Sequence, residues 1–136
     1  MRVDSWLRIA AWTLCAVVSA SAQDWVPKRI VAIRDYVPLA RMARVAGIAE
    51  VKCILDDNGS VRQADVISGH KLLKEQARQN ALLWQFQRTS SQVKTNTVTL
   101  IYEYLLEGPL QDHDNTVFLV EMPNRVRIIA PPAFIQ

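Results

Sequence analysis

Alternation of apolar and polar positions in the middle of the chain predicts two paired strands. Residues Ile48–Leu55 alternate in the way that is typical of a strand with one buried face. The side chains expected to face inward are Ala49, Val51, Cys53 and Leu55. Residues 56–59, Asp-Asp-Asn-Gly, predict a tight turn because Asn and Gly tolerate positive φ. Residues Val61–Ser68 then return as the second strand, with Ala64 and Val66 inward.

Apolar spacings of three and four predict two helices that flank this hairpin. The first is expected over Pro38–Val45, because Pro suits an initial helical position, and to end at Ala46-Gly47 with a left-handed glycine cap. The second is expected over Leu72–Trp84. Their predicted apolar faces comprise Leu39, Met42 and Ala43 in the first helix, and Leu73, Ala77, Ala81 and Trp84 in the second.

The longest strand signal, Thr97–Leu106, follows a polar, loop-like stretch at residues 87–96. One face of this strand comprises Val98, Leu100, Tyr102, Tyr104 and Leu106, and the other comprises Thr97, Thr99, Ile101, Glu103 and Leu105. Gly108-Pro109 ends the strand. These elements predict an α+β fold in which two helices pack on one face of a small antiparallel sheet with three core strands. If Thr97–Leu106 lies at the sheet edge, its unpaired backbone groups can bind another strand.

Residues 109–136 form a C-terminal extension in which a second hairpin is expected at 117–129. Val117–Met122 and Arg125–Ile129 flank Pro123-Asn124, and Pro131-Pro132 prevents a further strand. This hairpin can fold back onto the edge of Thr97–Leu106, and so can a second copy of the domain. The sequence does not decide between an edge covered by the hairpin, an edge covered by a second copy, and a free edge.

The first 22 residues have the features of a secretory signal peptide. Arg2 and Arg8 give a basic start, an apolar run follows, and Ala20-Ser21-Ala22 is a cleavage site of the usual type. The apolar run is about a dozen residues long, whereas a membrane span needs roughly 20. We therefore expect export and cleavage after Ala22, with an uncleaved anchor as the alternative. Residues 23–35 are expected to be a short lead-in.

Charge and cysteine content narrow the function classes. The net charge is +3, and the basic residues are scattered without interleaved aromatics, which argues against nucleic-acid binding. Cleavage of the signal peptide removes Cys15 and leaves Cys53 alone. Because Cys53 lies on the apolar side of a strand, a buried thiol is favoured over an intermolecular bridge.

No group of residues in the chain forms a convincing catalytic or metal site. His70 opens a helix and is expected to cap it or lie at the surface rather than act as a ligand or base. His113 stands within Asp-His-Asp, but three adjacent residues rarely converge on one metal ion. Cys53 and His70 do not form a nucleophile pair, because the cysteine faces the core. Trp84 and Phe86 are expected in the core rather than in an aromatic platform. We expect no catalysis, cofactor, metal or small-molecule substrate.

Seven short motifs follow one another between residues 36 and 108. They are Tyr36-Val37-Pro38-Leu39-Ala40-Arg41, Gly47, Val51-Lys52-Cys53, Asp56-Asp57-Asn58-Gly59-Ser60-Val61, Ser68-Gly69-His70 with Leu72-Leu73, Trp84-Gln85-Phe86, and Val98–Tyr104. In this order they resemble the C-terminal domain of the TonB family, which couples inner-membrane energy to outer-membrane receptors. The chain departs from the family pattern at Val37, Gln85 and Arg88, and it has neither a histidine before His70 nor a Pro-rich spacer.

The resemblance implies a periplasmic module that binds a segment of an outer-membrane receptor or another envelope protein. In the family, such a segment adds as a strand beside the last strand of the sheet. The partner-binding residues implied here are Thr99, Leu100, Ile101, Tyr102, Glu103, Tyr104 and Leu105. A homodimer is also open. The alternative function is an energy transducer of a TonB-dependent transport system, held in the inner membrane by an uncleaved N-terminal anchor and facing the periplasm.

Overall fold

The computed structural model describes residues 24–92, 95–110 and 115–133. Its elements are β1 (Trp25–Arg29), α2 (Pro38–Met42), β2 (Gly47–Leu55), β3 (Val61–Ser68), α3 (Lys74–Ala81), β4 (Gln85–Arg88), β5 (Thr97–Leu106), β6 (Val117–Glu121) and β7 (Arg125–Ala130). No helix within these ranges is long and apolar enough to cross a membrane. The predicted signal peptide and His113 lie outside the described residues.

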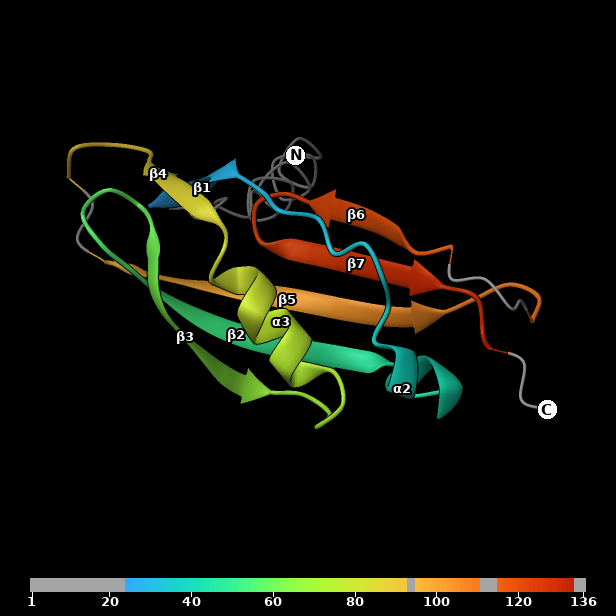
Figure 1. Ribbon diagram of the computed structural model, residues 1–136. Coiled ribbons are helices and arrows are strands. Elements are labelled where there is room, and N and C mark those ends of the chain that lie inside the picture. Colours follow the sequence, from blue (N-terminus) through green and yellow to red (C-terminus); the bar gives the residue numbers. More distant parts are fainter. Residues whose placement is uncertain (1–23, 93–94, 111–114, 134–136) are drawn as a thin grey trace, which may run out of the picture.

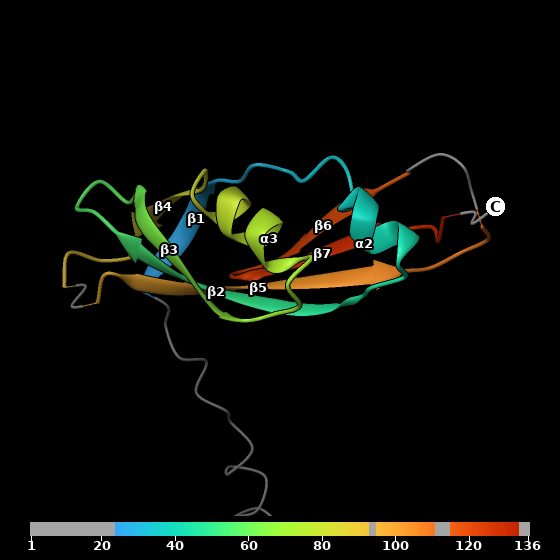
Figure 2. The same ribbon diagram turned by 60° about the horizontal axis from the view of Figure 1, so that its bottom comes forward.

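The main sheet has five strands in the order β3-β2-β5-β7-β6, and a separate pair consists of β1 and β4. All neighbours are antiparallel except β5 and β7, which run parallel. The two helices and the β1–β4 pair lie on one face of the sheet, and the described elements leave the other face uncovered (Figures 1 and 2). The predicted α+β fold is confirmed, but the sheet is mixed because β7 joins it.

The core lies between the sheet and the helices. The alternation predicted for β2 is confirmed, because Ala49, Val51, Cys53 and Leu55 are all buried. Their counterparts on β5 and the inner face of α3 meet them, and β-branched and aromatic side chains suit such a half-buried sheet. Trp84 and Phe86 are buried and stacked with ring centroids 6.0 Å apart, as expected of core residues.

Helix α2 differs from its prediction in length and in orientation. It ends at Met42, and Arg44 rather than Gly47 takes the left-handed conformation after it, with φ of 56°. The Val45 N–H bonds the Ala40 carbonyl at 2.8 Å and closes this turn. The predicted apolar face of Leu39, Met42 and Ala43 was wrong, because these side chains are exposed and Ala40 and Arg41 are buried instead.

Helix α3 is shorter than the predicted range, with turns on either side of it, but it presents the expected residues to the core. Leu73, Ala77, Ala81 and Trp84 are all buried. Asn80 joins them and is bonded on three sides. Its side-chain oxygen accepts bonds from Trp84 Nε1 at 2.9 Å and from the Tyr102 hydroxyl at 2.8 Å, and its amide donates to the Val31 carbonyl at 2.8 Å. These bonds satisfy a buried amide that would otherwise destabilise the core.

The lead-in is part of the fold rather than a structureless connection. Residues Trp25–Arg29 form β1 and pair with β4, which occupies the beginning of the predicted loop. Trp25 is buried, and its Nε1 donates to the Thr95 carbonyl at 2.7 Å. The two strands escaped prediction because each is short and β1 contains Pro27, so neither shows a sustained period.

Candidate protein-binding edge

The predicted partner-binding strand, β5, lies inside the sheet with a neighbour on each side. Strand β2 pairs with it antiparallel from Gly47↔Tyr104 to Ile54↔Thr97. Strand β7 pairs with it parallel from Ile101↔Arg125 to Leu106↔Ala130. The residues proposed for partner binding, Thr99–Leu105, therefore contact a new strand through their backbone only if β7 moves. Their role in binding stays a prediction.

The turn between β6 and β7 covers the start of this edge through Asn124. The Asn124 side-chain amide donates to the Thr99 carbonyl at 2.9 Å. The Asn124 carbonyl in turn accepts a bond from the Ile101 N–H at 2.9 Å. Asn124 thus bonds backbone groups of β5 at the first β5–β7 residue pair, Ile101↔Arg125, and two residues before it.

Three of the seven predicted residues face the core. Leu100, Tyr102 and Tyr104 are completely buried. The Tyr104 hydroxyl donates to Gln76 Oε1 at 3.0 Å, and its ring meets Tyr36 edge-on at 5.4 Å. Burial raises the pKa of both Tyr102 and Tyr104 above the ordinary tyrosine value. These three side chains hold the sheet to the helices and have no surface to offer a partner.

The other four residues, Thr99, Ile101, Glu103 and Leu105, lie on the opposite face, where Glu103 is the centre of a charge cluster. Glu103 Oε2 is 2.7 Å from Arg125 Nη2 and 3.2 Å from Arg127 Nε. Glu121 of β6 also contacts Arg127, at 3.3 Å. The hydrogen bond from Arg125 is the main reason that the pKa of Glu103 lies below its usual value. The cluster connects β5, β7 and β6 across the sheet.

The β6–β7 hairpin is also tied to the helix side of the domain. Arg41 of α2 is buried and donates from Nε to the Pro131 carbonyl at 2.7 Å. The Tyr36 N–H donates to Thr116 Oγ1 at 2.9 Å. Val126 and Ile128 of β7 are completely buried. Because each such side chain stabilises the fold by about 1.5–3 kcal/mol, detaching the hairpin costs several kcal/mol unless another strand replaces it.

The sheet has two outer strands, β3 and β6. Strand β3 exposes Arg62 and Asp65 and has an irregular register near both ends. Charged residues and bulges of this kind protect a sheet edge against pairing. Strand β6 has the sequence Val-Phe-Leu-Val-Glu, without proline or lysine, and Val117 and Leu119 are about half exposed. Of the two outer strands of the main sheet, β6 therefore offers the less protected edge.

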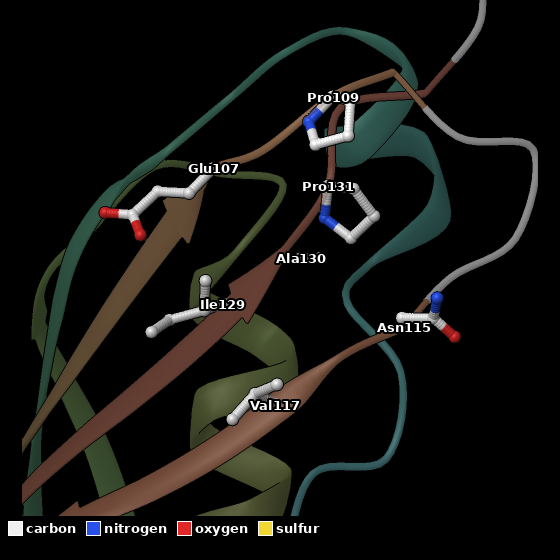
Figure 3. A pocket seen from close by; sticks show the side chains of 7 residues that line it. All are labelled: Glu107, Pro109, Asn115, Val117, Ile129, Ala130 and Pro131. Atoms are coloured by element: carbon white, nitrogen blue, oxygen red, sulfur yellow. The ribbon is translucent and has the colours of Figure 1, made fainter.

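A cavity of 210 Å³ lies where the hairpin meets the end of β5 (Figure 3). It is lined by Glu107, Pro109, Asn115, Val117, Ile129, Ala130 and Pro131. A second cavity, of 290 Å³, lies between α3 and residues 31–35. The linings contain no histidine, cysteine or serine, and the first holds a single carboxylate. Neither lining therefore combines a nucleophilic side chain with a histidine base.

The reactive residue types outside these cavities have structural roles. Cys53 is free and buried, and burial raises the pKa of its thiol to about 12. His70 lies at the surface, which is one of the two expected placements, and its Nδ1 accepts the Leu72 N–H at 3.1 Å in the turn that precedes α3. Within the described ranges, no three His, Cys, Asp or Glu residues gather to hold a metal ion. The absence of catalysis stays a prediction.

The sequence predicts the hairpin but does not predict which residues attach it to β5. No pattern predicted the bonds of Arg41, Asn124, Arg125 and Arg127, although each bonds a backbone or carboxylate oxygen of another segment. The sequence contained one indication of this attachment. Basic and apolar residues alternate at Arg125–Ile128, and the acidic Glu103 lies between inward-facing residues of β5. That pattern fits either direction of β7, so it does not reveal the parallel pairing.

The family comparison accounts for the central part of this arrangement. The family model for the C-terminal region of the Gram-negative bacterial TonB protein matches residues 34–105. The chain belongs to this family. The resemblance seen in the sequence is thereby confirmed, and the TonB-type region is a protein-interaction domain of the cell envelope. No curated protein and no solved structure matches the chain.

The TonB match includes nearly all of β5 but not the hairpin that covers it. The match ends at Leu105, near the end of β5, and starts after β1. The β6–β7 hairpin therefore lies outside the matched region, although β7 contributes Val126, Ile128 and Ala130 to the same core. In this TonB-type domain, the edge of the last matched strand is covered by a strand of the chain's own C-terminal extension.

Proposed function

We propose that this protein is a periplasmic protein-binding module that takes up an extended segment of an outer-membrane receptor or another envelope transport protein. The segment adds to β5 along Thr99–Leu105 and replaces β7 there. The module performs no chemistry itself. The observation that carries the proposal is the TonB match, which ends on β5, together with the occupation of that strand by a β-strand from outside the match.

Strand addition suits the backbone of β5. A partner strand supplies the same main-chain hydrogen bonds that β7 supplies now, and its alternate side chains give selectivity. The β7 pattern indicates which partner can compete. Val126 and Ile128 fill the core side, whereas Arg125 and Arg127 meet Glu103 on the other side. The segment we expect is an extended one that alternates apolar and basic residues.

The tethered hairpin lowers the affinity for such a segment. Because β7 is part of the same chain, it competes at a high effective concentration, which is in the millimolar range for short flexible linkers. The partner also has to offset the several kcal/mol that hairpin burial provides. We therefore expect partner binding to strengthen when the hairpin is loosened and to stop when it is locked.

A reversible lock on β7 tests the proposal. Leu105 and Ile129 are paired in the β5–β7 register and lie on the uncovered face, so Leu105→Cys with Ile129→Cys should form a disulfide across the two strands. Cys53 is buried and should not interfere. Envelope proteins captured by the reduced double variant should be lost after oxidation and regained after reduction.

Two results would count against the proposal in different ways. If no envelope protein binds the reduced double variant or the parent domain, the binding function itself fails. If a partner binds the oxidised and reduced forms equally, partner uptake does not require β7 to leave β5. The Leu105→Cys single variant, treated in the same way, controls for changes in the side chain itself.

A further inference from the structure

The appended hairpin gives the sheet a new outer strand whose edge is open. Strand β6 pairs only with β7, so one side of its backbone has no partner strand among the described residues. An unpaired edge of this kind binds other strands unless charge, proline or a bulge protects it. Its side chains on the uncovered face are Val117, Leu119 and Glu121, and Glu121 already contacts Arg127 of its own chain at 3.3 Å.

We propose that β6 pairs antiparallel with β6 of a second copy of this chain, with a two-fold axis at Phe118. This register places each Val117 opposite Leu119 of the other copy. Val117 and Leu119 are 48% and 46% exposed, so the pairing covers apolar surface that is otherwise in water. One residue pair further out, Asn115 lies opposite Glu121, an amide against a carboxylate. The two five-stranded sheets become one continuous sheet of ten strands.

Other registers match less well. A shift of the axis by half a residue pair would set the uncovered face of one strand against the core face of the other, which a continuous pleat does not allow. An axis at Leu119 would place Val117 opposite the charged Glu121. Parallel in-register pairing would place the two Glu121 carboxylates side by side, which is unfavourable. The antiparallel register at Phe118 separates these charges and keeps apolar residues together.

Self-pairing uses a different edge from the partner site on β5, so it does not depend on the proposed function. The two are nevertheless linked through the hairpin. A segment that displaces β7 also withdraws β6 from the second copy. Partner and second copy should therefore weaken each other's binding to the same degree, as linkage requires.

Sedimentation velocity on residues 23–136 tests the pairing. A single strand pair buries less surface than a standard stable interface, so the dimer should appear over concentrations from about 10 µM to 1 mM. Leu119→Glu should give a monomer throughout this range, because it places a charge in the strand interface. It should leave the fold intact, because the new carboxylate faces Arg127 in the same sheet.

Ile48→Lys is the matched control, because Ile48 is 49% exposed on the same face and lies opposite Glu103, away from β6. This variant should dimerise like the parent domain. A parent domain that stays monomeric at the highest concentration would overturn self-pairing. Dimerisation that survives Leu119→Glu would overturn it equally, whatever the outcome of partner capture.

Cysteine cross-linking tests the register. Val117→Cys and Leu119→Cys proteins, mixed and exposed to oxidised glutathione, should form a disulfide-linked heterodimer, because directly opposite residues have Cα atoms about 4.5–5.5 Å apart. Each variant alone should give almost no cross-linked product, since identical residues are then offset by two positions, about 7 Å along the strand. Strong cross-linking of Leu119→Cys with itself would contradict the Phe118 axis.

Discussion

Single buried polar groups hold distant segments of this small domain together. Arg41 reaches from α2 to the carbonyl of Pro131, beyond the end of β7, and Asn80 connects α3 to β5 and to the lead-in. A bond of this kind is specific, because its loss leaves a buried acceptor without its partner. Arg41 therefore helps to place the hairpin, and Asn80 helps to place α3 on the sheet.

The Arg41 contact should stabilise the whole domain measurably. Arg41→Met keeps the aliphatic stem and removes the donor, so the free energy of unfolding should fall by about 1.5–3 kcal/mol. Urea denaturation at neutral pH measures this. Arg62→Met on the exposed surface of β3 is the control and should change stability by no more than about 0.5 kcal/mol. If the two substitutions lower the free energy of unfolding equally, the bond from Arg41 to Pro131 does not stabilise the domain as proposed.

Glycine at position 59 is required by its conformation and by its surroundings. Its φ is +84°, and a Cβ there would lie 1.8 Å from the Phe86 carbonyl oxygen, which belongs to the backbone of β4. Gly108 also has positive φ, at +97°, but a Cβ there meets no atom within 4 Å. A side chain at Gly108 would therefore meet backbone strain alone, whereas one at Gly59 would meet both strain and a steric clash.

Replacement of these glycines by alanine should have unequal effects. Gly108→Ala should cost about 1–2 kcal/mol, the usual penalty for a left-handed non-glycine residue. Gly59→Ala should cost clearly more, because the chain must also move β4 away from the turn. Thermal unfolding of both variants measures the difference. Similar melting temperatures would mean that β4 does not press against the turn as described.

At the scale of elements, the sequence predicted what depends on local pattern. The strands β2, β3 and β5 and the hairpin of β6 and β7 follow from alternation over five or more residues and from turn residues between them. Strands β1 and β4 were missed because they are too short for a period. The direction of β7 was not predictable either, since long-range pairing depends on the burial of Val126 and Ile128 in the shared core rather than on local signals.

Attachment of the hairpin through Glu103 should depend on pH. The pKa of Glu103 is lowered in the folded state, so its ion pairs stabilise the fold above the unfolded pKa and lose this effect as pH falls through the folded value. Glu103→Gln should therefore be less stable than the parent at pH 7, and the difference should shrink below about pH 4. Glu50→Gln is the control, because Glu50 of β2 lies on the same face of the sheet as Glu103. A difference that is independent of pH would contradict this account.

At the scale of the whole molecule, the TonB-type region is extended on both sides by strands that share its core. Strand β1 precedes the matched residues, and the β6–β7 hairpin follows them. The domain boundaries expected from sequence, at residues 36 and 108, stay a prediction. The sheet as a whole gains an outer strand, β6, while the strand associated with binding in the family lies inside it.

The position of the protein in the envelope depends on residues 1–22. We expect the exported protein to begin at Gln23, because Ala20-Ser21-Ala22 fits a signal-peptidase site. N-terminal sequencing of the protein isolated from the periplasmic fraction decides this. A chain that keeps residues 1–22 and sediments with the inner membrane would instead favour the anchored energy transducer.

Backbone NMR of residues 23–136 during titration with periplasmic segments of outer-membrane receptors tests most directly whether a partner strand takes the place of β7. If it does, the amide signals of residues 99–105 shift, and those of 125–130 lose their protection from hydrogen exchange at the same peptide concentration. If a segment binds while 125–130 keep full protection, or if no segment shifts residues 99–105, the exchange of β7 for a partner strand is refuted.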